Sequence, residues 1–302
     1  PPRLTVGLPV YNGEAFLDAT IRAIRSQTFD DFVLFVADNA STDSTREIVE
    51  SHRAEDKRIQ LDVASENRGA SYNWNRCYWG ISSPYFTWAC ADDIPLPDKY
   101  RICVEALECA SPELVLAYPA TQLIDEHGEV TGDYDDIGPL DSAAPSVRFR
   151  RVVRDLSLVN PLFGVVRTEV LQGTAGMAAY KRADTVLLGE LAMRGQFGFV
   201  PEVHFQRRMH AAVSMQGSDE SIAEHYTGNA DDGPAHPFTQ LLRGHLAAIR
   251  NAPISHTQKL RCLTTLARWK YRKSFAKELG GGVGNMLGGG SRRRLKSAIT
   301  RR

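Results

Sequence analysis

Two adjacent carboxylates, Asp92 and Asp93, follow a short apolar run that has the composition of a buried strand. Neighbouring carboxylates repel each other, which destabilises a fold unless a cation or a set of hydrogen bonds compensates. Mg²⁺ is typically held by one or two carboxylates together with phosphate oxygens, and Mn²⁺ favours the same oxygen ligands. The pair therefore either caps a turn or holds a divalent cation. The predicted strands and helices around the pair show which of these two roles is favoured.

Polar residues also follow the first two predicted strands. The apolar run at residues 4–10 leads into the letters YN, and the run at 32–37 leads into DN. Helical patterns separate these strands, and this alternation is typical of βαβ units with a mostly parallel sheet. Ligands bind outside the carboxyl ends of the strands in such sheets. Because turn caps alone would place polar residues at both edges, the clustering at one edge favours a cation site.

The first 120 residues alternate predicted strands and helices. Strands are expected at 4–10, 32–37, 59–63, 85–89 and 114–118, and helices at 15–27, 44–52, 67–78 and 98–110. Ser44 and Glu47 have the spacing of a capping box for the second helix. Beyond Pro119 the pattern is mixed, with a hairpin expected at 121–130, strands at 162–166 and 197–208, and helices at 146–158, 184–194, 237–250 and 255–277.

Length and composition are those of a soluble globular chain. The 302 residues carry zero formal net charge, so bulk electrostatics indicates no nucleic-acid partner. The five cysteines form no CxxC pair, which fits reduced thiols in the cytoplasm. We expect neither a transmembrane helix nor a signal peptide, because no run of about 18 apolar residues occurs. Residues 291–302 are strongly basic and form either a solvated tail or a contact with an anionic membrane surface.

Neither of the common glycine motifs for phosphate binding occurs. The first strand is not followed by GxGxxG, and the sequence contains no GxxxxGK[ST]. A bound diphosphate would therefore need another partner, and a divalent cation held by carboxylates is the simplest one.

Several segments together resemble the family 2 glycosyltransferases, whose GT-A fold binds a sugar nucleotide. They are PVYNGE at 9–14, VADNASTD at 36–43, NRG at 67–69, ADD at 91–93, ADTVLLGELAMRG at 183–195 and RMH at 208–210. They occur in the family's order, and the resemblance covers about residues 4–215. It implies a GT-A-type, Rossmann-like α/β fold with a mostly parallel central sheet flanked by helices. It also implies metal-assisted, inverting transfer of a sugar from a nucleotide donor.

The resemblance implies that strand ends of the first half hold the nucleotide sugar. Asp38 would accept a hydrogen bond from the base, and Asn39 stands where many members have a second aspartate. The complete expected set is Pro9, Tyr11, Asn12, Asp38, Asn39, Asn67, Arg68, Asp92 and Arg208, with Asp92 beside the sugar and Arg208 on a phosphate. Structural alternatives are an aromatic packed on the sheet rim for Tyr11, a helix cap for Asp38 and a glycine turn for residues 67–69.

The resemblance also implies the metal ligands and the base. Asp93 would be the first metal ligand and His210 a second, whereas Ala91 replaces the first acidic residue of the commoner form. Asp184 would be the general base, on the sugar face opposite the leaving diphosphate, and a single displacement with this base inverts the anomeric carbon. The structural alternative for Asp184 is an N-cap of the following helix.

We therefore predict a glycosyltransferase domain at 1–217, with a nucleotide-binding half at about 1–120 and an acceptor half at about 121–217. A helical extension with a flexible basic tail would follow at 218–302. The expected donor is a nucleotide-diphosphate sugar with Mn²⁺ or Mg²⁺, and the expected acceptor is a cell-envelope glycan, a glycolipid or another hydroxyl compound. We expect a cytoplasmic protein. Peripheral contact of the tail with the inner face of the plasma membrane, and a homodimer through the helices at 237–277, stay open as alternatives to a solvated tail and a monomer.

Two rival functions stay open at this point. A sugar-phosphate nucleotidyltransferase would usually carry a glycine-rich loop with Arg and Lys after the first strand, where this sequence reads PVYNGEA. A non-catalytic scaffold that binds sugar nucleotides is kept open by Ala91 and Ala183, which replace acidic residues. Turnover of the donor with and without Asp184 separates the second rival from the enzyme.

Overall fold

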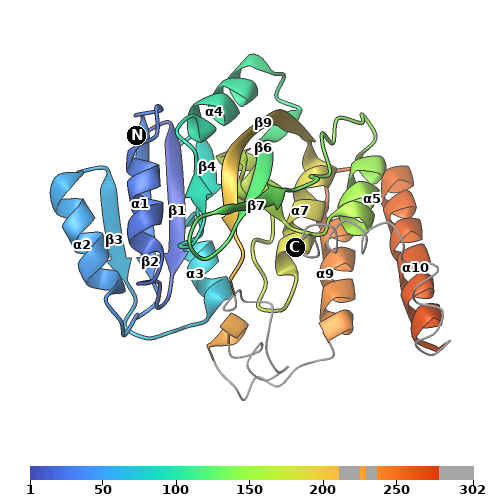
Figure 1. The fold of residues 1–302 in the computed structure, drawn as a ribbon. Helices are drawn as coiled ribbons and strands as arrows, with labels where there is room; N and C mark the ends of the chain where they lie inside the picture. The colour runs from blue at the N-terminus through green and yellow to red at the C-terminus, as the bar shows by residue number, and fades with distance from the viewer. Residues whose placement is uncertain (211–224, 229–236, 279–302) are drawn as a thin grey trace.

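The computed structural model describes residues 1–210, 225–228 and 237–278, which form a curled central sheet flanked by helices (Figure 1). The strand order is β3-β2-β1-β4-β8-β6-β9-β5, and β7 pairs with β6. The predicted α/β class is therefore confirmed. The predicted boundary at residues 217–218 and the basic tail lie outside the described residues.

The first half of the sheet is parallel, because each strand is an apolar run separated from the next by a helix. All seven residues of β1 are buried. The register aligns Val10 with Asp38 and Asp38 with Val63, so the first three strands end at one edge of the sheet. The elements are β1 (Leu4–Val10), α1 (Leu17–Arg25), β2 (Phe32–Asp38), α2 (Thr45–Glu55), β3 (Ile59–Val63), α3 (Ala70–Arg76), β4 (Tyr85–Trp88) and α4 (Lys99–Cys109).

The second half of the sheet is mixed. β8 runs antiparallel to β4 and β6, and β9 runs parallel to β6 but antiparallel to the short β5. The hairpin predicted at 121–130 is present as β6 and β7. These strands are β5 (Ile94–Pro95), β6 (Leu114–Ile124), β7 (Val130–Asp133), β8 (Val165–Arg167) and β9 (Gln196–Arg208).

The strand predicted at 162–166 is only partly right. Asn160–Phe163 form a 3-10 helix, and β8 begins only at Val165. Pro161 lies in the first turn of that helix, where its missing N–H is tolerated and its φ is pre-set. At Gly164 a Cβ would come within 2.5 Å of the Ala117 carbonyl oxygen, so the glycine permits close approach of the chain to β6.

Four helices of the C-terminal half pack together beside the sheet (Figure 1). They are α5 (Pro145–Asp155), α7 (Ala183–Arg194), α9 (Pro237–Asn251) and α10 (His256–Glu278), and the short α6 (Thr168–Gln172) precedes α7. Their shared core contains Phe149, Val153, Val186, Met193, Leu241, Ile249, Cys262 and Leu266. The helices after residue 236 thus pack on helices of the preceding part. Within the part of the chain that the structure describes, no helix is long and apolar enough to cross a membrane.

Candidate active site

Hydrogen bonds join the loops that follow β1 and β2. The Asn12 side-chain oxygen accepts from the Thr42 N–H at 2.8 Å, and the Gly13 N–H donates to Thr45 Oγ1 at 2.8 Å. Asn12 has a φ of 52°, a left-handed conformation that asparagine tolerates better than most residues. Tyr11, beside it, is 48% exposed at the sheet edge, so its ring is open to a ligand.

The capping box predicted from Ser44 and Glu47 is wrong. The Ser44 side chain makes no capping hydrogen bond to α2. Two carboxylates accept hydrogen bonds from backbone N–H groups at the N-terminus of α2 instead. Asp43 Oδ1 accepts from the Thr45 N–H, and Glu14 Oε2 accepts from the Ser44 N–H, both at 3.0 Å. Charged acceptors make stronger hydrogen bonds to backbone N–H groups than a hydroxyl does, which accounts for the exchange.

Asp38 is buried at the end of β2, and one of its carboxylate oxygens stabilises the turn that follows. Its Oδ1 accepts from the Ser41 N–H at 3.0 Å and from the Ser41 hydroxyl at 2.5 Å. Among the described residues no group donates to Asp38 Oδ2, which is therefore available for the base contact that we predicted. Pro9 lies in the adjacent strand β1, where it is buried and is aligned with Ala37 of β2.

Asn39 and Asn67 bind each other across the edge. Asn39 Nδ2 donates to Asn67 Oδ1 at 2.6 Å, and Asn39 Oδ1 accepts from the Arg68 N–H at 3.2 Å. The Arg68 guanidinium lies over the Tyr72 ring, 3.9 Å from its centroid. The hydrogen bonds of both side-chain amides thus stabilise the turn, whereas we predicted that these residues contact the ribose or the sugar.

Asp92 and Asp93 differ sharply in their surroundings. Asp93 is buried, and its Oδ1 accepts from the Arg208 N–H at 2.8 Å. Burial, and next the charge of Asp92, raise the pKa of Asp93 to about 7. The Asp92 side chain is 31% exposed, and its Oδ2 lies 3.0 Å from His210 Nε2. A buried carboxylate beside a second, accessible one favours a cation in the space between them.

The structure adds a thiol to this pair. The ligand atoms of Cys90, Asp92 and Asp93 all lie within 4.8 Å of one another. Two carboxylates with the imidazole of His210 nearby are a chemically suitable donor set for Mn²⁺ or Mg²⁺, and the thiol makes the set softer. The residues present therefore fit a divalent cation. Sequence analysis missed Cys90 because it considered only oxygen and imidazole ligands.

The side chain of Arg208 is bound by backbone carbonyls, and the phosphate contact that we predicted for it stays a prediction. Its side chain is buried: Nε donates to the Asp92 carbonyl oxygen at 2.8 Å, and Nη1 donates to those of Asp125 at 2.9 Å and Glu126 at 3.1 Å. The guanidinium also lies 4.8 Å from the Phe16 ring centroid. Three backbone carbonyls thus engage Nε and Nη1, which within the described residues leaves Nη2 for a phosphate.

Arg207, the preceding residue, points to the other face of β9 because side chains alternate along a strand. Its Nη1 donates to Asn160 Oδ1 at 2.8 Å. The charge of this guanidinium lowers the pKa of both Asp93 and Asp184 relative to burial alone, so one cation lies near both carboxylates. Nothing in the local sequence distinguishes these two adjacent arginines, and Arg207 was not among the predicted site residues.

Asp184 is the second residue of α7 rather than its N-cap. The helix begins at Ala183, and the capping position is Arg182, whose φ is 69°. Asp184 Oδ1 accepts from the Thr185 N–H at 2.6 Å. Burial raises the pKa of Asp184 above its ordinary value, and the charges of Arg182 and Arg207 oppose that rise. The alternative reading as an N-cap is therefore wrong, and the carboxylate has the raised basicity that suits a general base.

Similarity to known proteins agrees with this geometry. The family model of glycosyl transferase family 2 matches residues 5–120. Residues 5–120 form a family 2 glycosyltransferase domain. A Bacillus subtilis protein named for teichuronic acid biosynthesis, TuaG, is 28% identical over 98 residues, which are 32% of this chain and 39% of that protein. The chain thus matches less than half the length of such relatives.

Solved structures show that the glycosyltransferase fold extends beyond the family match. Residues 1–349 of S. aureus TarS in complex with UDP superpose with a TM-score of 0.65 at 14% identity, covering 94% of this chain and 76% of that one. The mannosyltransferase PcManGT from Pyrobaculum calidifontis, in complex with GDP-Man and Mn²⁺, gives a TM-score of 0.50 at 18% identity over 99% and 86% of the two chains. The predicted GT-A fold is confirmed.

A short segment of the chain, residues 225–228, lies against the turn at 67–69. Gly69 and Gly228 have φ of 80° and 75°. A Cβ on Gly69 would meet the Tyr226 carbonyl oxygen at 2.5 Å, and one on Gly228 would meet the Asn67 carbonyl oxygen at 2.8 Å. Two residues without side chains thus let the segments touch by their backbones, which the sequence did not indicate.

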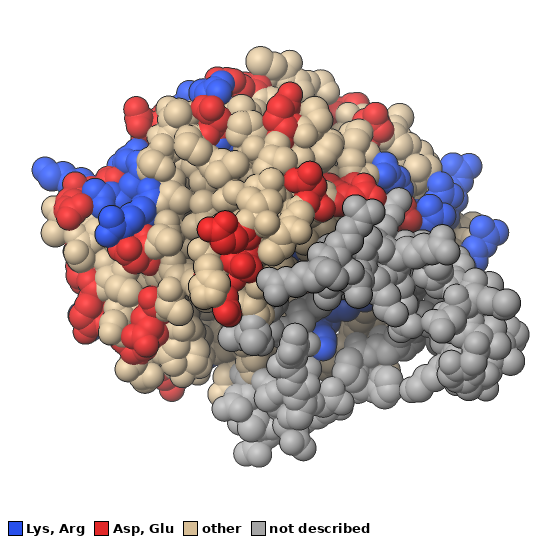
Figure 2. Space-filling view, viewed as in Figure 1, with Lys and Arg blue, Asp and Glu red and all other residues tan. Residues whose placement is uncertain are grey.

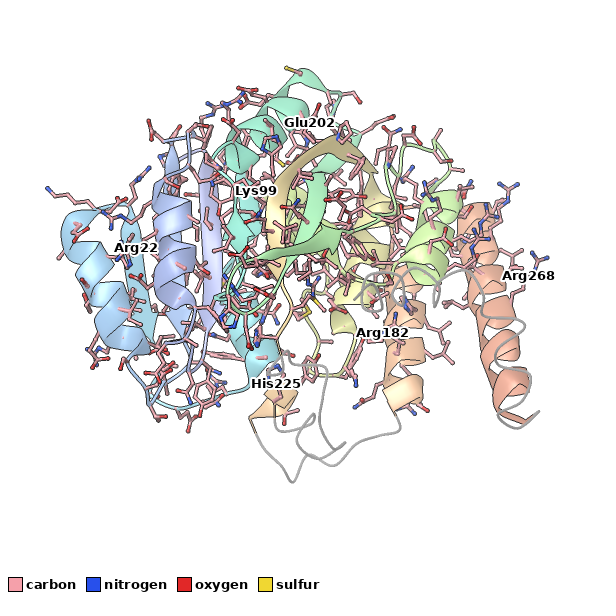
Figure 3. All side chains as sticks on the ribbon, viewed as in Figure 1. Arg22, Lys99, Arg182, Glu202, His225 and Arg268 are labelled. Carbon is pink, nitrogen blue, oxygen red and sulfur yellow. The ribbon has the colours of Figure 1, made fainter. Side chains whose placement is uncertain are left out.

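The same segment brings Tyr226 to the candidate base. Burial, and next the charge of Asp184, raise the pKa of the Tyr226 hydroxyl to about 12. Figure 3 labels His225 and Arg182, which lie at the same end of the sheet near this contact. Tyr226 is thus a site residue that sequence analysis missed, because nothing local links position 226 to position 184.

Proposed function

We propose that this chain transfers a sugar from a nucleotide-diphosphate donor to a hydroxyl acceptor, with inversion at the anomeric carbon. The observation that carries the proposal is the buried carboxylate of Asp93 beside the accessible one of Asp92, whose Oδ2 lies 3.0 Å from His210 Nε2. The Arg207 guanidinium interacts electrostatically with both Asp93 of the metal pair and the buried carboxylate of Asp184. A cation site for the departing diphosphate and a separate buried carboxylate as base are the groups that a single displacement at a sugar carbon uses.

Asp93 and Asp92 would hold a divalent cation, with His210 beside them. When bound, that cation supplies Lewis-acid stabilisation of the departing diphosphate. The hydrogen bond from the Arg208 N–H fixes one oxygen of Asp93, so its other oxygen has a defined direction for a ligand. Support for the metal comes from the donor set and from the Mn²⁺ that accompanies GDP-Man in the structure of PcManGT.

Asp184 would take the proton of the acceptor hydroxyl. A carboxylate with a pKa raised by burial holds that proton better than an exposed aspartate, which favours it as a base. Thr185 orients the carboxylate by donating its N–H to Oδ1. Tyr226 and Arg207 line the same region, where they would exclude water and balance the charge.

The donor nucleotide and the acceptor follow from relatives. TarS has been solved with UDP and with UDP-GlcNAc, which supports a uridine donor. TuaG is named for an anionic cell-wall glycan, and a 29% identical stretch occurs in a teichoic acid poly(glycerol phosphate) polymerase of Staphylococcus epidermidis. We propose a cell-envelope glycan as the acceptor and the cytoplasm as the location. A homodimer through α9 and α10 stays a prediction.

Calorimetric titration with UDP, GDP and dTDP tests the donor site, each in the presence of Mn²⁺, Mg²⁺ or EDTA. We expect one nucleotide to bind only with metal, and Asp93→Ala to abolish that binding. Asp31→Ala is the matched control, because Asp31 is exposed at the opposite end of β2. No binding of any nucleotide, or binding that EDTA does not change, would overturn the metal-assisted donor site.

A non-catalytic scaffold is the second candidate, and the replacements Ala91 and Ala183 favour it. It shares the binding prediction but not the turnover prediction. Release of nucleotide from the matching nucleotide sugar, slowed by Asp184→Asn, supports the enzyme. Metal-dependent binding without any release, in the presence of cell-envelope acceptors, supports the scaffold.

A further inference from the structure

A cleft of about 550 Å³ lies between α5 and α10, away from the candidate active site. Its walls carry Arg150 and Arg154 from α5 and Arg261 and Arg268 from α10, and none of the described residues that line it is acidic. Lys and Arg side chains gather at this edge of the molecule in Figure 2, where Figure 1 shows α5 and α10. Figure 3 labels Arg268 on the outer helix.

The spacing of these arginines along each helix places their side chains on the faces that line the cleft. Arg150 and Arg154 are one turn apart on α5, and residues 261, 264, 265 and 268 recur along one side of α10. Ser146 and Val153 form part of the floor and are buried. The cleft is therefore a basic groove built from two packed helices, with small uncharged side chains between the arginines.

Most of this positive charge has no internal partner. Arg154 pairs with Asp155 at 2.8 Å. Over residues 1–210, 225–228 and 237–268, no carboxylate forms an ion pair with Arg150, Arg261 or Arg268. Like charges one turn apart or across a groove destabilise a fold, so this arrangement favours an external anion. Guanidinium groups bind phosphate through two parallel hydrogen bonds.

Exposed leucines adjoin the basic groove on the same helix. Leu260 is 65% exposed and Leu263 is 39% exposed. One face of α10 carries both kinds of side chain, because residues four apart lie above one another on a helix. Along this face the exposed Leu260 is followed by Thr264, which lines the groove, and then by Arg268. A soluble anion would use the arginines alone, whereas a bilayer surface uses both kinds of side chain.

We propose that the α5–α10 cleft and the adjoining side of α10 bind the phosphate headgroups of an anionic phospholipid bilayer. The arginines would hold the phosphates, and Leu260 and Leu263 would enter the acyl boundary. This contact uses residues within the packed domain and is separate from the basic tail at 291–302. It does not depend on the proposed transfer reaction.

Co-sedimentation of the full chain with vesicles tests the proposal. We expect binding to vesicles that contain phosphatidylglycerol, weak binding to pure phosphatidylcholine, and loss of binding at high salt. Removing two arginines in Arg261→Ser/Arg268→Ser should lower the partition coefficient about 30-fold at low salt. Leu260→Ser/Leu263→Ser should also lower it, but with an unchanged salt dependence.

A charge-matched variant, Arg46→Ser/Arg53→Ser, removes two exposed arginines from α2 at the opposite edge of the sheet and should bind vesicles like the unchanged chain. All substituted side chains are exposed, so circular dichroism and thermal unfolding should stay unchanged. Equal vesicle binding by both arginine variants would overturn the proposal. So would calorimetric binding of glycerol phosphate that depends on Arg261 and Arg268 without vesicle binding, which would assign the cleft to a soluble phosphate compound.

Discussion

His210 Nε2 lies 3.0 Å from Asp92 Oδ2, although the two residues are 118 positions apart in the sequence. The contact joins the chain just after β9 to the acidic pair after β4. The Phe16 ring also packs against the imidazole of His210, with 4.9 Å between the two ring centroids. His210 is thus placed either to ligate a metal or to orient the carboxylate that does.

Replacing His210 by glutamine should weaken the metal site without removing it. Loss of a ligand or of its orienting partner typically lowers metal affinity about 10- to 100-fold. The Mn²⁺ concentration for half-maximal nucleotide binding should rise by that factor, as measured by calorimetry. His204→Gln, which changes a histidine of β9 that has no contact with Asp92, should leave it unchanged. An unaltered Mn²⁺ requirement in His210→Gln would remove the histidine from the metal site.

Asp184→Asn should abolish catalysis while leaving the donor bound. A positioned general base contributes about 10²- to 10⁴-fold to rate, and the amide keeps the volume and the hydrogen bond from the Thr185 N–H. We expect kcat to fall within that range and the nucleotide Kd to stay constant. If kcat stays within a few-fold of the unchanged chain, another group must accept the proton.

The acidic limb of the pH profile should depend on Arg182. Its charge opposes the rise in the pKa of Asp184, so removing the charge raises that pKa further. The carboxylate then becomes protonated at a higher pH on acidification, and the acidic limb of kcat/KM moves to higher pH. Arg182→Asn is the suitable change, because asparagine tolerates the φ of 69°. Lys181→Gln removes a neighbouring charge and should not move the limb.

Gly69→Ala should separate the segment at 225–228 from the turn at 67–69. The new Cβ would meet the Tyr226 carbonyl oxygen, and φ is positive. Gly80→Ala is a matched control, since Gly80 has a φ of 69° but no atom within 4 Å of its Cβ position. Both variants should lose about 1–2 kcal/mol of folding stability from backbone strain. Only Gly69→Ala should also raise the KM for the donor.

Asn73→Ala should loosen the ends of the first two strands. Asn73 Nδ2 donates to the Ala37 carbonyl at 2.8 Å and to the Val10 carbonyl at 3.2 Å, within the buried interior. Leaving both carbonyls without this donor should lower the free energy of unfolding by about 1–3 kcal/mol. Gln60→Ala, which removes an exposed amide from β3, should change it little in urea unfolding.

The parts of the site predicted from sequence are those set by local pattern. Apolar runs that stop at polar residues located Asp38, Asp92 and Asp93 at one sheet edge, because strand burial and strand ends are local properties. Arg207 was missed because nothing local distinguishes it from Arg208, and the direction of each side chain depends on how β9 pairs with the distant β6. Tyr226 was missed because its place depends on a backbone contact between two distant glycines.

The guanidinium of Arg208 has a mechanical consequence. It joins the carbonyl of Asp92 to those of Asp125 and Glu126 at the tip of the β6–β7 hairpin. The hairpin and the acidic pair should therefore move as one body, and a ligand that displaces either should displace the other. Such coupling is reciprocal. Donor binding should slow hydrogen exchange of the hairpin amides, and an acceptor that docks on the hairpin should tighten the hold on the donor.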